Sequence, residues 1–359
     1  MSHYRSYNSL IWQRFRKNIP GMAGLIIIIL TCMCAVFAYV IAPDNSPFAD
    51  TQTVEIQAMP PGHQQLFLKS NKRETTEANN WLSGSQPKYD LVPVTRYQIS
   101  GDSILVKKYL DENAAESFVL HRKDLLFKNS EDNFIKKRYW LGTDGFGRDI
   151  LSRLLVGTRV SLAVGFVSVF ISLAIGIFLG ALAGYYKGRT DSIITWMINV
   201  SWSIPTLLLV FAITMAVGKG FWQIFIAVGL TMWVSVARLV RGQVLSIREM
   251  EYVQAAKALG FSDKRVILRH ILPNLTGPLM VIAAANFASA IIIEAGLSFL
   301  GIGVQPPQAS WGLMIKENYN LIITDQPFLA LVPGIAIMIL VLAFNLLGNA
   351  LRDAFDVRQ

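Results

Sequence analysis

One short run of residues has a composition that could hold a phosphate group. It reads GTDGFGRD, from Gly142 to Asp149, and its glycines would let backbone N–H groups approach an anion closely. A P-loop ends in Gly-Lys-Ser or Gly-Lys-Thr, yet no such ending follows this run, and the pattern G-x-x-x-x-G-K-[ST] occurs nowhere in the chain. The sequence therefore predicts a protein that does not itself hydrolyse ATP by that route.

Other residues that could do chemistry stand alone. His270 has no accompanying Ser, Cys or carboxylate constellation, so we expect it to be a loop residue and not a catalyst. Cys32 and Cys34 lie two positions apart in one apolar run, which on a helix points them to nearly opposite sides. We expect no catalytic residue, no metal site and no cofactor in this chain.

A few polar residues interrupt long apolar runs. Glu294 lies in AIIIEAGLSFLG, where an ionisable side chain is costly unless it faces protein or water. It belongs either to the path of a solute or to a structural pair, or it lies near a membrane interface. Asn199, Ser201 and Ser203, with Pro205 after them, offer a polar face and a kink that would suit either a lined cavity or helix packing through small polar residues. Asn199, Ser203 and Glu294 are our candidates for a translocation path.

The elements that must position these residues are membrane helices. The chain has 359 residues, of which 53% are hydrophobic and 16% charged, and its mean hydropathy is +0.42, too apolar for a soluble globule. The net charge of +9 comes from Lys and Arg scattered among short loops, with no basic stripe interleaved with aromatics. Nucleic acid is therefore not an expected partner, whereas membrane lipid is.

Six apolar runs are each about as long as a spanning helix, which needs about 20 residues. They cover Met22–Ala42 and approximately 161–184, 193–217, 221–237, 277–302 and 329–350. The predicted fold class is an all-α polytopic membrane protein with six transmembrane helices. A cleaved signal peptide is the rival interpretation of the first run, but that run is long for one and Pro43 follows it at once.

The basic residues predict which loops face the cytoplasm. No acidic residue accompanies the bases ahead of the first run, so the positive-inside rule keeps this end inside. The same orientation places the loop 185–191, the segment 238–276 and the C-terminal tail inside. These are the bases concerned: Arg5, Arg14, Arg16, Lys17, Lys187, Arg189, Arg238, Arg241, Arg248, Lys257, Lys264, Arg265, Arg269 and Arg352. Both termini are expected in the cytoplasm.

Residues 44–138 are polar and are expected to form an extracytoplasmic insert between the first and second helices. Residues 1–43, with the first transmembrane helix, precede it, and a transmembrane domain, 139–359, follows it. Within the insert, LVPVTRYQISGDSILVKKY predicts two strands around Gly101-Asp102, with Pro93 confining the first to an edge or a strand start. We therefore expect a small β-containing domain.

The start of the second membrane helix has a patterned charge distribution. After Gly147, four apolar residues share one helical face: Ile150, Leu151, Leu154 and Leu155. Three charged residues lie off that face: Arg148, Asp149 and Arg153. This pattern predicts a helix lying at the outer membrane interface. It would be either a packing collar above the bundle or, if the resemblance described below holds, a contact for a partner that delivers a solute.

A charged, helix-prone segment, EYVQAAKALGFSDKRVILRHILPN, stands between two apolar runs. Four of its residues share one helical face: Tyr252, Ala255, Ala256 and Leu259. Because Ala255 and Ala256 are small, another surface can approach the helix backbone closely there. Gly260 is suited to end this helix with positive φ, Ser262 to cap a second one, and Pro273 to end that second helix. Two short helices joined by a Gly-Phe turn are expected; a solvated loop with helical fragments is the alternative.

The series Ala255-Ala256, Gly260 and HILPN resembles the cytoplasmic EAA loop of ATP-binding-cassette importer permeases. Gln254 stands at the position of the acid in that motif, and Glu251 lies one turn earlier. The resemblance implies that this loop, at about 241–274, docks on an ATPase subunit. The residues that would dock are Glu251, Gln254, Ala255, Ala256, Leu259, Gly260 and Phe261.

Three further motifs are similar to permeases of the dipeptide, oligopeptide and nickel group: WLGTDGFGRDILSRLLVGTRVSL from Trp140, EAGLSFLGIGVQPPQASWG from Glu294, and NLLGNALRDAFD from Asn345. The chain thus resembles the second permease, or C-type subunit, of such importers, with the type I transmembrane fold. The insert is larger than expected for that group.

The resemblance implies a permease that moves peptides or a related small solute across the bacterial inner membrane. Its expected partners are a second homologous permease, two cytoplasmic ATPase subunits that bind the ATP, and an extracytoplasmic solute-binding protein. A stand-alone channel or ion-coupled carrier is the alternative, although the spans carry few ionisable residues for coupling. A sensor or scaffold with a ligand-binding outer domain is a third possibility.

Overall fold

The computed structural model describes residues 7–72, 81, 83–111, 114–127, 129–218, 220–322 and 326–356. The chain divides into two compact units. The bundle unit comprises Met1–Cys32, Ser161–Gln305 and Ile335–Gln359, and the sheet unit comprises Met33–Val160 and Pro306–Gly334.

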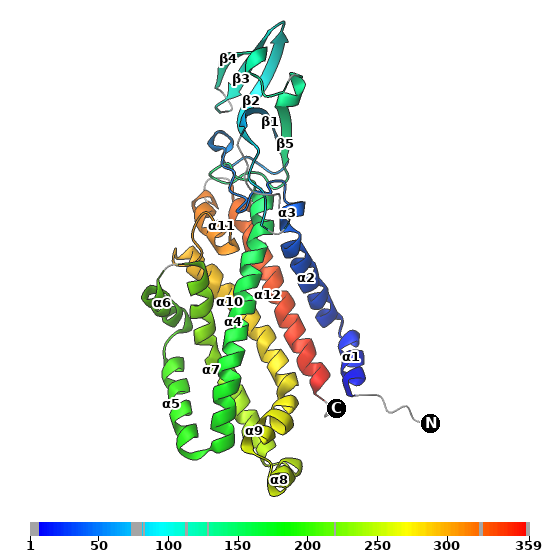
Figure 1. Cartoon of the computed structure of the whole chain (residues 1–359), viewed down its shortest axis with the longest axis vertical. Coiled ribbons are helices and arrows are strands. Elements are labelled where there is room, and N and C mark those ends of the chain that lie inside the picture. Colours follow the sequence, from blue (N-terminus) through cyan, green and yellow to red (C-terminus); the bar gives the residue numbers. More distant parts are fainter. Residues whose placement is uncertain are drawn as a thin grey trace, which may run out of the picture. The chain divides into compact units, whose positions relative to one another are not determined.

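The helices of the bundle unit are drawn in Figure 1. They are α1 (Tyr7–Lys17), α2 (Ile19–Val36), α4 (Ile150–Tyr186), α5 (Gly188–Ser203), α6 (Thr206–Val217), α7 (Phe221–Arg248), α8 (Glu251–Ala258), α9 (Asp263–Val266), α10 (Thr276–Phe299) and α12 (Phe328–Phe355), of which α2, α4 and α12 continue into the sheet unit. Among the described residues, five helical stretches are long and apolar enough to cross a membrane: α2, α4, α7, the path from Asp263 to Phe299, and α12.

The predicted span at 193–217 is broken. α5 and α6 are bent by 96° at the break, and the two would make a sixth span only if counted together. Figure 1 draws them as two separate helices. The break lies at Ile204 and Pro205, whose backbone is extended with ψ near 127° at both residues. Proline disfavours helical geometry at the residue before it, so the kink predicted from Pro205 is a full interruption.

A stripe of glycines brings α4 close to α7. Gly176, Gly180 and Gly184 recur every fourth residue, so they share one face of α4. A Cβ at Gly180 would come within 2.6 Å of the carbonyl oxygen of Ala237, and one at Gly184 within 2.8 Å of that of Arg241. Membrane helices associate through such small residues, because close backbone approach maximises van der Waals contact where no hydrophobic driving force operates.

The prediction that Pro273 ends the second short helix is wrong. After α9 the chain passes through a π-helical turn, Ile267–Ile271, and a 3₁₀ turn, Leu272–Leu275, directly into α10. Pro273 lies in the first turn of the 3₁₀ segment, just after the π-helical turn, so its missing N–H interrupts the hydrogen-bond ladder where the helix changes geometry but does not end the helical path. The loop is therefore joined to α10 by one continuous helical path.

The sheet unit contains an antiparallel sheet in the order β4-β3-β2-β1-β5 (Figure 1). The strands are β1 (His63–Lys72), β2 (Tyr89–Ser100), β3 (Ser103–Tyr109), β4 (Ala115–His121) and β5 (Phe134–Tyr139). β2 and β3 are the two strands expected around Gly101, and Leu68, Val94 and Ile104 form part of the core. β2 is an inner strand, but it pairs with β3 only from Val94 onward, so Pro93 has a partner on the β1 side alone.

Short helices complete the sheet unit: α3 (Ala38–Ile41), α11 (Trp311–Asn318) and the 3₁₀ turns Val54–Ile56, Arg122–Asp124, Glu131–Asn133 and Tyr319–Ile322. The α11 helix begins with a side-chain cap, since Ser310 Oγ accepts a hydrogen bond from the N–H of Leu313 over 3.2 Å. Within the same unit, the indole of Trp311 donates to the carbonyl of Leu154 over 3.0 Å. This contact ties α11 to the first turns of α4.

Candidate functional site

The segment between α7 and α10 folds as the two predicted helices, α8 and α9, with a tight turn between them. Gly260 has φ of +77°, its N–H donates to the carbonyl of Lys257, and the N–H of Phe261 donates to that of Ala256. This hydrogen-bond pair is the Schellman motif, which satisfies carbonyls at a helix end and favours glycine at the left-handed position. The turn that displays the end of α8 is therefore specified locally.

The four residues expected on one helical face of this segment differ in their exposure in the folded chain. Ala256 is 4% exposed and packs with Val253, Val266 and Ile271, so it belongs to the core of the bundle unit. Ala255 is exposed, and Leu259 is 74% exposed. Adjacent residues of a helix point about 100° apart, which allows Ala255 to face outward while Ala256 faces the core. Of the two alanines, only Ala255 is therefore exposed.

The remaining residues of this segment form a mixed surface. Glu251, Gln254 and Gly260 are exposed, whereas Phe261 is half-buried and packs against the cluster that contains Ala256. Gln254 Nε2 donates to the carbonyl of Arg248, the last residue of α7, over 3.1 Å. The side-chain amide of Gln254 therefore connects α8 with the end of α7. His270 stacks on Phe261, with ring centroids 5.9 Å apart, as a residue of the π turn.

Tyr185, at the end of α4, contacts three parts of this segment. The phenolic O–H of Tyr185 donates to Asp263 over 2.5 Å, and its main-chain carbonyl accepts from Arg248 over 2.6 Å. The centroid of its ring lies 4.5 Å from the Nζ of Lys257. The ring is 3% exposed. The side chain therefore joins α4, the end of α7, α8 and α9 at one point, which we call the Tyr185 joint.

An ion pair flanks the Tyr185 joint. Lys187 Nζ lies 2.8 Å from Glu249 Oε1, which connects the α4–α5 turn with the α7–α8 turn. The hydrogen bond and charge of Lys187 hold the pKa of the exposed Glu249 carboxyl below its ordinary value. Nearby, Arg241 makes a bidentate contact with Asp191 of α5, an arrangement that fixes orientation as well as charge.

A cavity of about 450 Å³ lies beside the break between α5 and α6. Its polar lining is supplied by Ser201, Trp202, Thr206, Thr231, Ser235, Asn286 and Ser289, from α5, α6, α7 and α10. None of the described residues that line it is charged. Neutral polar groups that converge in an otherwise apolar cavity are typical of a small-molecule site.

None of the three candidates for a translocation path is among the described residues that line this cavity. Asn199 and Ser203 are exposed on α5, but they are not among the lining residues; Ser201, between them, is. Glu294 is fully buried and accepts a hydrogen bond from Ser298 over 2.7 Å, while Ser298 Oγ accepts one from the N–H of Val304. Those contacts favour the structural-pair interpretation of Glu294. The prediction from sequence did not include the polar lining residues of α7, Thr231 and Ser235, or those of α10, Asn286 and Ser289. Their spacings of four and three residues place each pair on one helical face, which is a signal that the sequence contains.

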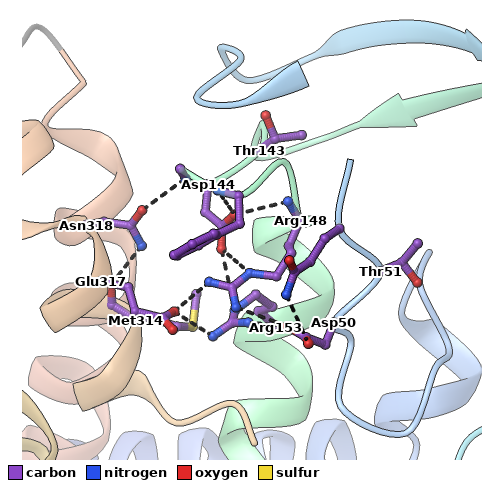
Figure 2. A network of polar contacts seen from close by, with 12 residues as sticks. Asp50, Thr51, Thr143, Asp144, Arg148, Arg153, Met314, Glu317 and Asn318 are labelled. Carbon is purple, nitrogen blue, oxygen red and sulfur yellow. Dashed lines mark hydrogen bonds and ion pairs between the residues drawn. The ribbon is translucent and has the colours of Figure 1, made fainter. Parts of the chain in front are cut away.

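The start of α4 differs from the predicted interfacial helix. Arg148 and Arg153 have side chains only 3% and 1% exposed, and Figure 2 shows their guanidinium groups directed toward three carboxylates, those of Asp50, Asp144 and Glu317. Arg148 Nη2 lies 2.6 Å, and Arg153 Nη2 2.9 Å, from Glu317 Oε2. Burial disfavours the charged form of Arg148, yet Asp144 and Glu317 overcome this and raise its pKa. The charges thus face the interior of the sheet unit, and the helix from Ile150 is the first part of α4.

The glycines of GTDGFGRD serve chain packing in this unit. Gly142 and Gly147 have φ of +80° and +71°, and a Cβ at Gly147 would lie 1.8 Å from the carbonyl oxygen of Thr53. Only glycine tolerates both the left-handed backbone and that approach. The run is a structural turn that leads into Asp149, whose carboxylate accepts a hydrogen bond over 2.9 Å from the N–H of Ser152 in the first turn of α4.

Comparison with known proteins decides the family. Residues 176–359, just over half of the chain, match the model described as binding-protein-dependent transport system inner membrane component. The chain belongs to this permease family. Residues 6–61 match the N-terminal transmembrane domain of oligopeptide transport permease C. The C-type importer permease predicted from the motifs is thereby confirmed.

Curated relatives agree with this membership. The permease is 43% identical over 218 residues to a glutathione transport system permease protein of Pectobacterium atrosepticum, covering 61% of this chain and 72% of the relative. It is 40% identical over 220 residues to an oligopeptide transport system permease protein of Bacillus subtilis, with 61% and 72% covered. Among solved structures, an inward-facing methionine ABC transporter matches at a TM-score of 0.47 and 20% identity, over 55% of this chain and 93% of that one.

The family establishes the general role of the permease. It is a multi-pass inner membrane protein, the membrane-spanning component of an ABC importer, and ATP hydrolysis resides in separate subunits. Residues 62–175, which include the strands β1 to β5, lie outside both matched regions.

Proposed function

We propose that this permease translocates peptides or a related small solute, together with a second homologous permease, two ATPase subunits and an extracytoplasmic binding protein. Curated relatives named for dipeptide, oligopeptide and glutathione transport support this substrate class. The observation that carries the proposal is the exposed face at α8, where Tyr252 and Leu259 are 45% and 74% exposed on either side of the exposed Ala255. A group of exposed apolar side chains on one face supports a protein partner, whereas a single exposed leucine would not.

The docking surface comprises the exposed residues of the loop, and the buried ones support it. Glu251, Gln254, Ala255, Leu259 and Gly260 would contact the ATPase, whereas Ala256 and Phe261 would hold α8 against the bundle core. ATP-driven closure of the ATPase dimer would move α8, and the continuous path from Asp263 to Phe299 would carry that movement into α10. Such a lever needs contacts that differ between the two states of the transporter.

The proposed topology has six spans, with α5 and α6 together counted as one, and both termini in the cytoplasm. Packing within the bundle unit supports a common side for the termini, because Phe15 of α1 packs with Ala350 and Ala354 of α12. Arg14 Nη1 also donates to the carbonyl of Asp356 over 2.9 Å. Residues 44–138 would then be extracytoplasmic.

The insert at 44–138 would widen the surface on which the binding protein docks. Residues 62–138 of the insert lie outside both family regions, which supports an added role and not the shared transport mechanism. Replacing residues 63–138 by a short Gly/Ser linker should weaken association with the binding protein while the two permeases and ATPases still co-purify. Unchanged association would remove this part of the proposal.

The central test is affinity purification of the tagged permease from its native membranes, with co-purifying proteins identified by mass spectrometry. We expect an ATPase, a second permease and a binding protein, and peptide-stimulated ATP hydrolysis in proteoliposomes that contain all of them. Recovery of the chain alone, still moving solute without ATP, would instead establish a stand-alone channel or carrier.

A further inference from the structure

Arg238 is a charged residue at the edge of a neutral cavity. It lies in α7, three and four residues after Ser235 and Val234, which both line the cavity beside the α5–α6 break, so it shares their face of the helix. The predicted span ended at residue 237 and left Arg238 in a cytoplasmic segment. The helix instead continues to Arg248, which makes Arg238 part of a spanning-length helix.

The position of the Arg238 side chain is set by an aromatic residue of the cavity. Its guanidinium carbon lies 3.2 Å from the ring centroid of Trp202, which lines the cavity, and Nη2 is 3.5 Å from Asn199 Oδ1. Stacking on an aromatic face leaves the edge of the guanidinium, with its N–H donors, available for a ligand. Trp202 thus orients the cation at the cavity.

The charge of Arg238 is not neutralised within the described part of the chain, where no carboxylate forms an ion pair with it. Arg241, three residues later, has Asp191 as its partner. An arginine is always charged, and on a spanning helix it is costly unless it faces water or an anion. The side chain is exposed, so it meets that condition only in a wet path or against an anionic ligand.

We propose that Arg238, held by Trp202, is a specificity-determining residue that binds the carboxylate of a solute in the cavity beside the α5–α6 break. This inference rests on the proposed function and deepens it, since it defines the chemical class as solutes with a free carboxylate, such as the C-terminus of a peptide. The neutral Ser, Thr and Asn groups suit the backbone amides of such a solute, and the guanidinium fork suits its carboxylate, which it would bind with two parallel hydrogen bonds.

The test uses the complete transporter, with its second permease, ATPases and binding protein, in proteoliposomes. A mixed pool of tri- to pentapeptides is offered with free C-termini, and the same pool as C-terminal amides, with imported peptides quantified by mass spectrometry. Arg238→Gln should lower the import ratio of acids to amides roughly tenfold, because a charge-assisted hydrogen bond is lost. The same binding protein serves every variant, so its own preference cancels in this comparison.

Two further variants keep the result interpretable. Arg238→Lys should retain part of the ratio, and Arg241→Gln, which breaks the ion pair with Asp191, should leave the ratio unchanged. If Arg238→Gln fails to assemble, Trp202→Leu removes the ring that orients the cation and should also lower the ratio. An unchanged ratio in an assembled Arg238→Gln, or in Trp202→Leu where that replaces it, overturns the inference.

Failure of the underlying function looks different. If the wild-type transporter imports neither pool while its ATPase still responds to the binding protein, the peptide assignment is wrong, and the inference falls with it. If wild type imports both pools and the acid-to-amide ratio is the same in Arg238→Gln, the peptide assignment stands and only the role of Arg238 is rejected.

Discussion

The phenol of Tyr185 donates a 2.5 Å hydrogen bond to Asp263, 78 positions further along the chain. Tyr185 is at the last turns of α4, and Asp263 is the first residue of α9, so one contact connects a membrane helix with the turn that follows α8. Arg248 and Lys257 also contact Tyr185. In the proposed mechanism, these contacts would pass movement of the loop to α4 as well as to α10.

Removing the phenolic oxygen should loosen this connection without unfolding the bundle. We predict that Tyr185→Phe, which keeps the buried ring, lowers peptide import per ATP hydrolysed by several-fold, while the ATPases still co-purify. The loss of one charge-assisted hydrogen bond, about 1.5 to 3 kcal/mol, is the physical reason. Import and ATP hydrolysis measured in the same proteoliposomes check the ratio. Tyr186→Phe is the matched control, and an equal effect there would argue against the Tyr185 joint.

The two alanines of the loop should respond differently to the same substitution. Ala255→Glu adds a charge to an exposed surface, so we predict loss of the ATPase in pull-downs with normal amounts of the permease in the membrane. Ala256→Glu places an unpaired carboxylate in the core cluster, at a cost of several kcal/mol, and should reduce the amount of folded permease itself. Quantitative blotting of membranes and pull-downs separates the outcomes. Equal behaviour of both variants would contradict the division of the faces.

The buried arginines should depend on their acidic partners. We predict that Glu317→Gln lowers the Tm of the purified permease by roughly 4 to 7 °C, because breaking a buried pair costs about 3 to 5 kcal/mol. Arg148 and Arg153 both lose a charged partner in this variant. Thermal unfolding in detergent provides the measurement, with Lys316→Gln as the neighbouring control. A shift no larger than that of the control would show that the network is not important for stability.

Asp149 should make stability depend on pH. Burial raises the pKa of its carboxyl in the folded state, although hydrogen bonds from Ser152 oppose the shift. A raised folded pKa means that the contribution is present below the unfolded pKa and is lost as the pH rises through the folded value. Asp149→Asn stays neutral and can still accept from Ser152, so its Tm advantage over wild type should grow from about pH 4 to pH 7. A Tm difference between Asp149→Asn and wild type that stays constant over this pH range would contradict the prediction.

Local sequence patterns determined much of this protein. The apolar runs predicted five of the spanning-length helices, because a helix in hydrocarbon must satisfy its own backbone and needs about 20 apolar residues to do so. The α8–α9 turn was equally predictable, since positive φ at Gly260 is a local requirement. The Tyr185 joint, in contrast, needs partners from three helices and had no local signal.

Only the tertiary structure decided which faces are buried. The alternation of apolar and charged residues after Gly147 pointed Arg148 and Arg153 outward, yet Asp50 and Glu317, 98 and 169 positions from Arg148, pair with it inside the sheet unit. Likewise, Ala255 and Ala256 are adjacent residues of the same type, and their environments differ because only one side of α8 packs against the bundle. Periodicity describes the helix itself, whereas burial depends on residues that only the folded chain brings into contact.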